Sequence, residues 1–203
     1  MFIPKQFQIT DFEIMKEFIN ENSFATIVST EHGRPIATHV PLLIRQIERE
    51  YYITGHLAYT NPQWKTFEDN KQVLVIFQGP HAYVSSSWYS HENVPTWNYQ
   101  SIHIYGKAQL MNEQELEEDL ILLLQKYERH RKNSIIWEKL SSKTKRQIKG
   151  IIGVKIKINE AQAAYKLSQN RNEEDYQSII DHLYEETDIN AHQVAEAIEK
   201  IRK

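Results

Sequence analysis

The residues most suited to ligand chemistry lie between Gly79 and Tyr99, where aromatic rings occur among turn-forming residues. Pro80, Pro95 and Asn98 interrupt any single strand or helix here. The rings are those of Tyr83, Trp88, Tyr89, Trp97 and Tyr99. Flat rings held on turns suit a flat ligand, although the same rings could cap the end of a barrel or fill a subunit interface.

The segment that follows has a two-residue period. One face of the expected strand carries Trp97, Tyr99, Ser101, His103 and Tyr105. The opposite face carries Ile102 and Ile104, which are suited to a core. A strand facing solvent rarely has so many rings, so we expect this aromatic face to meet a ligand, a partner subunit or both.

Histidines are frequent in the same half of the chain, but their spacing does not favour a metal. The candidates are His39, His56, His81, His91 and His103. No two of them have the HxH or HxxxH separation of familiar zinc sites, so no metal site is predicted. A single axial histidine for haem remains open.

Nucleophilic catalysis has little support, and no catalytic residue is predicted. Ser85, Ser86 and Ser87 lie near His81, yet the chain has no GxSxG or SxxK motif. Its six glycines do not form a phosphate-binding loop. Any phosphorylated cofactor must therefore be held by isolated amides and by side chains such as Thr54, Lys166 and Ser168.

Composition indicates a cytoplasmic protein. The 203 residues include no cysteine, and their formal net charge is -3. We expect no cleaved signal and no membrane span, because no apolar run approaches about 20 residues. Residues 129–157 hold ten Lys or Arg against one Glu. This segment is either a solvated face or a nucleic-acid contact, for which the candidates are Lys143, Lys145, Arg146 and Lys149.

The pattern before residue 112 predicts a mainly antiparallel sheet. Thr10 and Glu13 indicate a capping box for a helix that ends near Glu21, and Asn61-Pro62 indicates the start of a short helix. About six strands are expected. They lie at 24–30, 36–44, 51–55, 73–77 (buried on both faces), 81–85 and 100–111. Because strands and helices do not alternate, a closed or half-closed barrel is favoured.

The second half predicts more helix. Asn112 and Glu115 form a capping box for one helix, and further helices are expected at 133–149, 172–186 and 190–201. Residues 152–158 alternate as a strand with one wet face. The predicted domains are a barrel over 1–170, with inserted helices at 112–149, and a helical extension over 171–203. The fold class is α+β, mainly β with helices.

The chain resembles the PaiB-type FMN-binding negative transcriptional regulators. The matching blocks are Ala-Thr-His-Val-Pro-Leu-Leu at 37–43, Gly-His-Leu-Ala at 55–58, Val-Leu-Val-Ile-Phe-Gln-Gly-Pro-His-Ala-Tyr at 73–83, Val-Pro-Thr-Trp-Asn-Tyr at 94–99 and Lys-Leu-Ser-Gln-Asn at 166–170. The resemblance implies an FMN-binding split barrel, similar to that of pyridoxamine-phosphate oxidases, which forms a homodimer with flavin at the subunit interface.

The resemblance also implies which residues approach the flavin. One subunit would supply Thr38, His39, Thr54, Gly55, His56, Asn61 and Trp64, and the other Trp97, Asn98, Tyr99, Lys166, Ser168 and Gln169. Thr54, the Gly55 amide and Lys166 would hold the phosphate, Trp64 or Trp97 would cover the ring, and His39 or His56 would bond its polar edge. Related oxidases bring arginines to the phosphate, whereas residues 51–70 have only Lys65, so haem remains an alternative cofactor.

The implied function is negative regulation of sporulation and protease genes, in a protein that binds rather than catalyses. Two alternatives stay open. One is an FMN-dependent oxidoreductase that acts on a small metabolite and affects regulation indirectly. The other is a haem-binding or haem-degrading protein.

Overall fold

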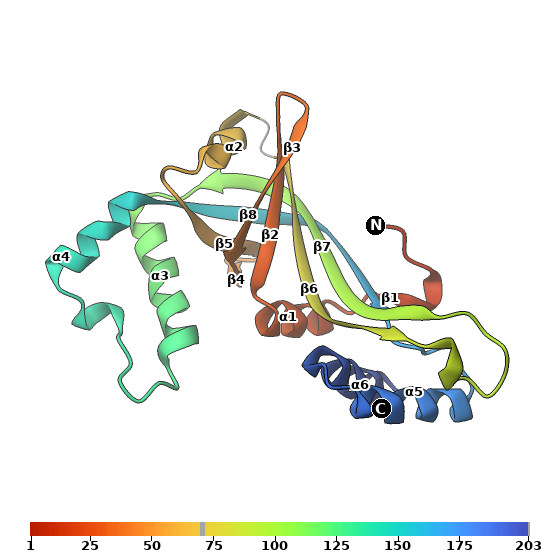
Figure 1. Ribbon diagram of the computed structural model, residues 1–203. Coiled ribbons are helices and arrows are strands. Elements are labelled where there is room, and N and C mark those ends of the chain that lie inside the picture. The colour runs from red at the N-terminus through yellow and green to blue at the C-terminus, as the bar shows by residue number, and fades with distance from the viewer. Residues whose placement is uncertain (70–71, 203) are drawn as a thin grey trace. The chain divides into compact units, whose positions relative to one another are not determined.

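The computed structural model describes residues 1–69 and 72–202, which form an antiparallel eight-stranded sheet with helices (Figure 1). The sheet order is β3-β2-β6-β7-β8-β5-β4, and β1 pairs with β8. The strands are β1 Gln8–Ile9, β2 Phe24–Glu31, β3 Arg34–Pro41, β4 Leu43–Ile47, β5 Glu50–Ala58, β6 Gln72–Val84, β7 Thr96–Leu110 and β8 Ile151–Lys166. The predicted α+β class is therefore confirmed.

The helices connect and cover these strands. The α-helices are α1 Phe12–Glu21, α2 Thr66–Asp69, α3 Glu113–Glu128, α4 Ser142–Lys145, α5 Glu173–Glu185 and α6 Ile189–Ile201. Short 3₁₀ turns occur at η1 Lys5–Phe7, η2 Pro62–Lys65, η3 Ser86–Trp88, η4 Trp137–Lys139 and η5 Arg146–Gly150. Among the residues that the structure describes, no helix is long and apolar enough to cross a membrane.

The chain divides into two compact units that are interleaved along the sequence. Unit 1 contains Met1–Phe18, Gln78–His103 and Gln162–Lys203, and unit 2 contains Ile19–Phe77 and Ile104–Ala161. The long strands β6, β7 and β8 each contribute residues to both units. The domain boundary predicted after residue 170 lies inside unit 1.

Unit 2 holds the barrel-forming strand pairs β2–β3, β4–β5 and β5–β8. Their inward side chains, such as Ile27, Ile53 and Ile156, are fully buried. Close strand packing requires glycine at Gly106, where a Cβ would lie 2.3 Å from the Lys157 carbonyl oxygen. At Gly55 a Cβ would lie 2.6 Å from a methyl carbon of Leu42, so this glycine serves strand packing.

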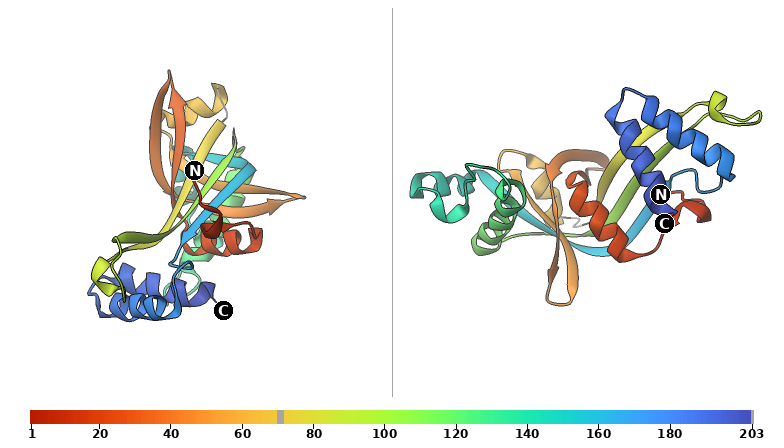
Figure 2. Two further views of the ribbon diagram at one scale, coloured as in Figure 1. Left: turned by 90° about the vertical axis from the view of Figure 1, so that its right-hand side faces the viewer. Right: turned by 90° about the horizontal axis from the view of Figure 1, so that it is seen from below.

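Unit 1 is built around the last two helices, which lie side by side (Figure 2). Their inner faces are apolar and buried, as at Ile179, Leu183, Val194 and Ile198. The Tyr176 hydroxyl donates to the Ile198 carbonyl oxygen at 2.6 Å and ties the two helices together. Asn172 caps α5, and Asp188 caps α6.

The predicted helix at 133–149 is wrong. The segment forms only η4, α4 and η5. Ile136 and Leu140 are extended, and the Trp137 indole donates to a Glu117 carboxylate oxygen on α3 at 2.6 Å. Burial of Trp137 against α3 therefore outweighs local helix propensity.

Several strand boundaries also differ from the prediction. The segments 73–77 and 81–85 belong to one strand, β6, and Leu74 and Ile76 are partly exposed instead of buried on both faces. The predicted strand 36–44 is divided between two strands, because β3 ends at Pro41 and β4 begins at Leu43. In the described residues seven strands, not six, precede residue 112. At α1 the Asp11 carboxylate, rather than Thr10, accepts the Glu13 amide.

Candidate functional site

Two of the predicted site residues, Thr38 and Asn61, belong to a closed hydrogen-bond network in unit 2. Asn61 caps η2 through the Gln63 amide, and its Nδ2 donates to the Thr38 hydroxyl at 2.9 Å. The Thr38 hydroxyl in turn donates to Oε1 of Gln63. Both side chains are therefore used to dock η2 on β3.

Gln63, which the sequence analysis did not single out, is the centre of this network. It is 2% exposed, and its Nε2 lies 3.1 Å from the Ile27 carbonyl oxygen and 3.1 Å from the Ser29 hydroxyl. The Thr66 hydroxyl donates to Ser29 and to the Gln63 carbonyl oxygen. Because its polar atoms are satisfied inside the protein, the network is structural.

The other two unit 2 candidates near this network are more exposed. His39 Nδ1 lies 2.8 Å from the Thr26 hydroxyl, and its ring stacks on Phe24 at 6.4 Å between centroids. The Trp64 indole donates to the Tyr59 carbonyl oxygen, and Lys65 Nζ lies 5.8 Å from the Trp64 ring. These rings and this cation are accessible to a ligand.

A second polar cluster in unit 2 lies where α3 packs on β5 and where its side chains reach β4 and β8. Arg45 on β4 approaches Asp119 on α3 at 3.3 Å, and Lys155 on β8 donates to Glu115, one helical turn before Asp119. Thr54 and His56 lie on β5, the strand between those two. The helix therefore spans three strands and is held by an ion pair on each side.

Buried polar atoms in this second cluster lack hydrogen-bond partners in the described residues. Three buried side-chain atoms have no hydrogen-bond partner among the described residues: Thr54 Oγ1, His56 Nδ1 and Asp119 Oδ2. Thr54 and Asp119 are both 0% exposed. Burial lowers the pKa of His56, although the Asp119 carboxylate acts in the opposite direction. Burial therefore favours the neutral form of the His56 ring.

In unit 1, Trp97 is the centre of an exposed group of rings. Trp97 is 52% exposed, and the centroid of its ring lies 6.0 Å from the ring centroids of both His81 and Tyr83. The alternation predicted for β7 is confirmed, because Ile102 and Ile104 on the other face are fully buried. We call Trp97, Tyr83 and His81 the ring platform.

Farther along the same face, Tyr99 and His103 are partly exposed. The Nδ1 atom of His103 is buried and has no partner in the described part of the chain. Burial lowers the pKa of His103, and the amino group of Met1 lowers it further. This face therefore presents neutral imidazole beside the rings.

The remaining unit 1 candidates lie on the opposite face of β7, at the end of β8 or in the loop after it. Asn98 is fully buried and donates to the Ser168 hydroxyl at 2.8 Å, while its Oδ1 lacks a partner in the described residues. Lys166 donates to the Thr96 hydroxyl. Gln169 bonds the backbone of Tyr165 and Leu167 and so closes the loop on itself.

The electrostatics of Lys166 differ from those of a surface lysine. Burial lowers its pKa, and the neighbouring Arg171 lowers it further. It forms no ion pair among the residues that the structure describes. An anion would remove both the like-charge repulsion and part of the desolvation cost.

The predicted basic residues lie on α4 and η5. Lys143, Arg146 and Lys149 are exposed, and Lys145 Nζ lies 5.3 Å from the Trp137 ring. No ion pair involves these four residues within the described ranges.

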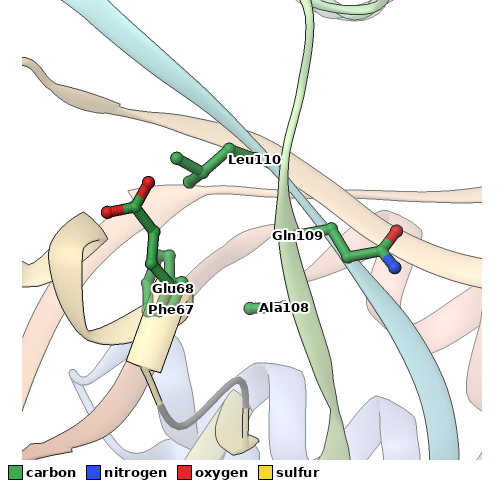
Figure 3. A pocket seen from close by; sticks show the side chains of 5 residues that line it. All are labelled: Phe67, Glu68, Ala108, Gln109 and Leu110. Carbon is green, nitrogen blue, oxygen red and sulfur yellow. The ribbon is translucent and has the colours of Figure 1, made fainter.

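Figure 3 shows a pocket of about 290 Å³ in unit 2, lined by Phe67, Glu68, Ala108, Gln109 and Leu110. It presents a carboxylate and no cation, and Gln109 points to the other side of β7. It therefore does not suit a phosphate. Among the described residues no group of three or more His, Cys, Asp or Glu is placed to hold a metal.

The seven site residues predicted for one subunit lie in unit 2, and the six predicted for the other lie in unit 1. Sequence reasoning missed Gln63, Arg45 and Asp119. Only the spacing of Glu115 and Asp119, one helical turn apart, signalled a polar stripe on α3. No sequence pattern connects Asp119 with Arg45, which lies 74 residues earlier.

The fold and these surfaces define a class of protein, an α+β split barrel with exposed aromatic rings. Residues 1–160 match the family described as "Putative FMN-binding domain", and the chain belongs to this family. It is 57% identical over 205 residues to "Protease synthase and sporulation protein PAI 2" of Bacillus subtilis, covering 100% of this chain and 99% of that protein. The predicted family is thus confirmed.

Solved structures agree on the fold. The FAD and haem binding protein from Mycobacterium smegmatis matches with a TM-score of 0.64 and 14% identity, over 84% of this chain and 79% of that chain. The flavocytochrome Anf3 from Azotobacter vinelandii also matches with a TM-score of 0.64. Its identity is 18%, and the match covers 85% of this chain and 75% of the Anf3 chain. FMN is the candidate cofactor, with haem as the alternative.

Proposed function

We propose that this protein is an FMN-binding negative regulator of protease synthesis and sporulation, and that it acts as a cytoplasmic homodimer. The observation that carries the proposal is the 57% identity over the whole chain to a Bacillus subtilis protein whose name refers to these two processes. The family description supplies the cofactor. A flavin on a regulator would couple gene control to the redox or metabolic state of the cell.

The ring platform fits the isoalloxazine ring of FMN. Trp97 exposes about half of its side chain to solvent. The ring centroids of Tyr83 and His81 each lie 6.0 Å from the centroid of the Trp97 ring. Offset stacking on such a ring contributes about 0.5–1.5 kcal/mol beyond area burial. In the proposal the flavin ring therefore lies on Trp97.

The phosphate of FMN requires a cation that is not already paired. Thr54 is fully buried and Gly55 packs against Leu42, so neither offers an open phosphate surface. Lys166 and Arg171 form a positive pair in unit 1, and Lys166 bonds Thr96 at the first residue of β7. We therefore assign the phosphate to Lys166.

A homodimer would cover the outer face of β2, β3 and β6 in unit 2. Phe24 is 69% exposed there, beside His39 and the partly exposed Val28, Leu74 and Ile76. An apolar face of this kind is typical of subunit contacts. Light scattering should give a dimer for the wild type and a monomer for Phe24→Asp. A monomeric wild-type protein would remove this part of the proposal.

The cofactor is tested on purified full-length protein. We expect FMN by mass and visible spectrum, or saturable binding when free FMN is added to the apoprotein. Trp97→Ala should weaken FMN binding about tenfold, while Tyr184→Ala, an exposed ring on α5, should leave it unchanged. Haem binding without FMN binding would favour the haem alternative. Turnover with NADH or NADPH would favour the oxidoreductase.

The regulatory role is tested by complementation. A Bacillus subtilis strain lacking its own relative should regain normal extracellular protease and spore counts when this protein is expressed. Trp97→Ala should fail to restore them at equal protein level, whereas Tyr184→Ala should succeed. Normal complementation by a variant that has lost FMN would separate regulation from the cofactor.

Direct contact with DNA is favoured by the exposed cations on α4 and η5. Lys143, Arg146 and Lys149 lack carboxylate partners in the described part of the chain, so they can neutralise phosphates. Triple reversal to Glu should abolish DNA binding and its salt dependence. Reversal of Lys5 and Lys107, two exposed lysines elsewhere, should have a smaller effect. Wild-type protein that does not bind DNA would show that regulation is indirect.

A further inference from the structure

The connection between β6 and β7 joins the two strands that carry the ring platform. Tyr83 lies near the end of β6, and Trp97 lies near the start of β7. Residues 85–95 between them form η3 and an irregular segment, and they belong to unit 1. A connection of this length is mobile unless other contacts hold it. Contacts that fix it therefore also fix the strand ends on which the rings lie.

Residues 88–91 of this connection lie along one face of α5 (Figure 1). On the helix, Asp175, Ser178 and His182 are three and four residues apart, so they share that face. The Ser178 hydroxyl donates to the carbonyl oxygen of Trp88 at 2.7 Å. The His182 ring stacks on the Trp88 ring with the centroids 5.2 Å apart. The helix thus holds both the backbone and the side chain of Trp88.

The next residue, Tyr89, is held just before the start of α5. The guanidinium carbon of Arg171 lies 4.7 Å from the centroid of the Tyr89 ring, and its Nη2 donates to the Tyr89 hydroxyl at 3.2 Å. The Tyr89 side chain is buried. The contact with α5 therefore continues along the connection.

Asp175 makes the most hydrogen bonds to the connection. It is 1% exposed, and its Oδ1 accepts from the amide and the hydroxyl of Ser90 at 2.8 and 2.9 Å. Its Oδ2 accepts from Asn172 Nδ2 at 3.0 Å and lies 3.4 Å from Nδ1 of His91. The Ser90 amide holds the pKa of Asp175 below its ordinary value, and the first turn of a helix also favours a negative charge.

The hydrogen bonds around this carboxylate require a group that only accepts. Ser90 offers an N–H and an O–H, and Asn172 offers its NH₂ group. Asn172 cannot turn its amide without loss, because its Oδ1 accepts the Asp175 amide at 2.8 Å. An asparagine at position 175 would point its own NH₂ group at one of these donors. The site is therefore built for aspartate, which makes it a specific anchor for the connection.

We propose that Asp175 is a positioning residue for Trp97, because it anchors the β6–β7 connection on α5 and so orders the ring platform. Its consequence, tighter binding of FMN, rests on the proposed function. Helix α5 lies outside residues 1–160, which match the family. The helices after residue 170 are then part of the ligand site and not a separate extension.

The order of the platform is measured by ¹⁹F NMR on full-length protein labelled with 5-fluorotryptophan, with the four resonances assigned by single Trp→Phe variants. Asp175→Ala should shift or broaden the resonances of Trp88 and Trp97. It should leave those of Trp64 and Trp137, which belong to unit 2, unchanged. An unchanged Trp97 resonance in the folded variant would overturn the proposal.

Two further variants separate positioning from general damage to the helix. Asp175→Asn keeps the size of the side chain and should move the same two resonances by a smaller amount. It decides the question if Asp175→Ala unfolds, and an unchanged Trp97 resonance would again count against the proposal. Asp181→Ala, which removes an exposed carboxylate from the same helix, is the matched control and should move neither resonance. An equal shift of Trp97 in this control would show that Asp175 has no special role.

Binding of free FMN gives the second measurement. Asp175→Ala should weaken FMN binding about tenfold, and the double variant Asp175→Ala/Trp97→Ala should bind no more weakly than Trp97→Ala alone. This is expected because Asp175 acts through Trp97. Additive losses in the double variant would overturn that route. If the wild-type protein does not bind FMN, the proposed cofactor fails, while the ¹⁹F spectra still decide whether Asp175 positions Trp97.

Discussion

Two polar clusters in unit 2 both contain threonine and other polar side chains, yet one is fully hydrogen-bonded and the other has unpaired buried atoms in the described residues. Around Gln63 the amides and hydroxyls of Thr38, Asn61 and Ser29 bond one another. Between α3 and β5 the hydroxyl of Thr54 and one oxygen of Asp119 are buried without partners in the described residues. The first cluster holds η2 on the sheet, whereas the second leaves buried polar atoms without partners in the described residues.

This difference shows that a polar residue in a matching motif is not by itself a ligand residue. Thr38 and Thr54 were both predicted to face the cofactor. The Thr38 hydroxyl forms hydrogen bonds with two neighbouring side chains, whereas the Thr54 side chain is fully buried. The two threonines differ in whether the buried hydroxyl has a hydrogen-bond partner in the described residues, and their amino-acid type does not reveal this.

The largest effect is expected at the centre of the saturated cluster. Gln63→Ala removes the donor to Ile27 and Ser29 and leaves these groups unpaired. The free energy of unfolding should fall by about 3 kcal/mol in urea titrations. Gln147→Ala, at an exposed position, is the control and should change it by less than about 0.5 kcal/mol. Similar losses for both variants would contradict the structural role of Gln63.

The next effect concerns the ion pair that holds α3. Asp119→Ala removes the partner of Arg45, whose side chain is 20% exposed and so keeps some hydration. We expect a loss of about 2 kcal/mol in the free energy of unfolding. Glu128→Ala, at the far end of the same helix, should cost much less because its partner Arg131 is exposed. Equal costs at the two positions would show that Arg45 gains little from Asp119.

A direct comparison of the clusters uses their two threonines. Thr38→Val breaks hydrogen bonds to Asn61 and Gln63 and should lower the free energy of unfolding by about 1.5 kcal/mol. Urea titration of this variant beside the wild type measures the change. A neutral substitution would mean that η2 is held by packing alone.

Acidity should act on the unsaturated cluster. Burial lowers the pKa of His56 in the folded state below its unfolded value near 6.5, so the unfolded chain takes up the proton first. Stability should therefore fall as the pH drops below about 6.5 and continue to fall until the folded pKa is reached. The loss is at most about 1.4 kcal/mol per pH unit for one group. His56→Gln should flatten this part of the profile, although His103 adds a slope of the same sign.

The smallest effect is expected for Thr54→Val, because its hydroxyl bonds no protein group in the described residues. We expect a change below about 1 kcal/mol, less than the change at Thr38. Thermal unfolding of both variants at one pH provides the comparison. A larger loss at Thr54 than at Thr38 would reverse the distinction between the clusters.

Much of the architecture could be predicted from local patterns. The alternation along β7, the capping box of α3 and the Asn61 cap of η2 are features of neighbouring residues, and the structure contains all three. The helix predicted at 133–149 failed because Trp137 finds its partner, Glu117, on another element. The enclosure of Thr54 and Gly55, which the resemblance assigned to the phosphate, also comes from tertiary packing and has no signal in the local sequence.

The fold class, the family and the exposed aromatic face of β7 could be predicted from residues close in the chain, because periodicity, caps and motifs are local features. Which polar side chains are hydrogen-bonded and which are unpaired in the described residues depends instead on the packing of distant elements. Arg45 and Asp119 are 74 residues apart, and Gln63 bonds residues that lie 34 and 36 positions before it. Such pairings are set by the packing of whole elements, and local sequence carries no record of them.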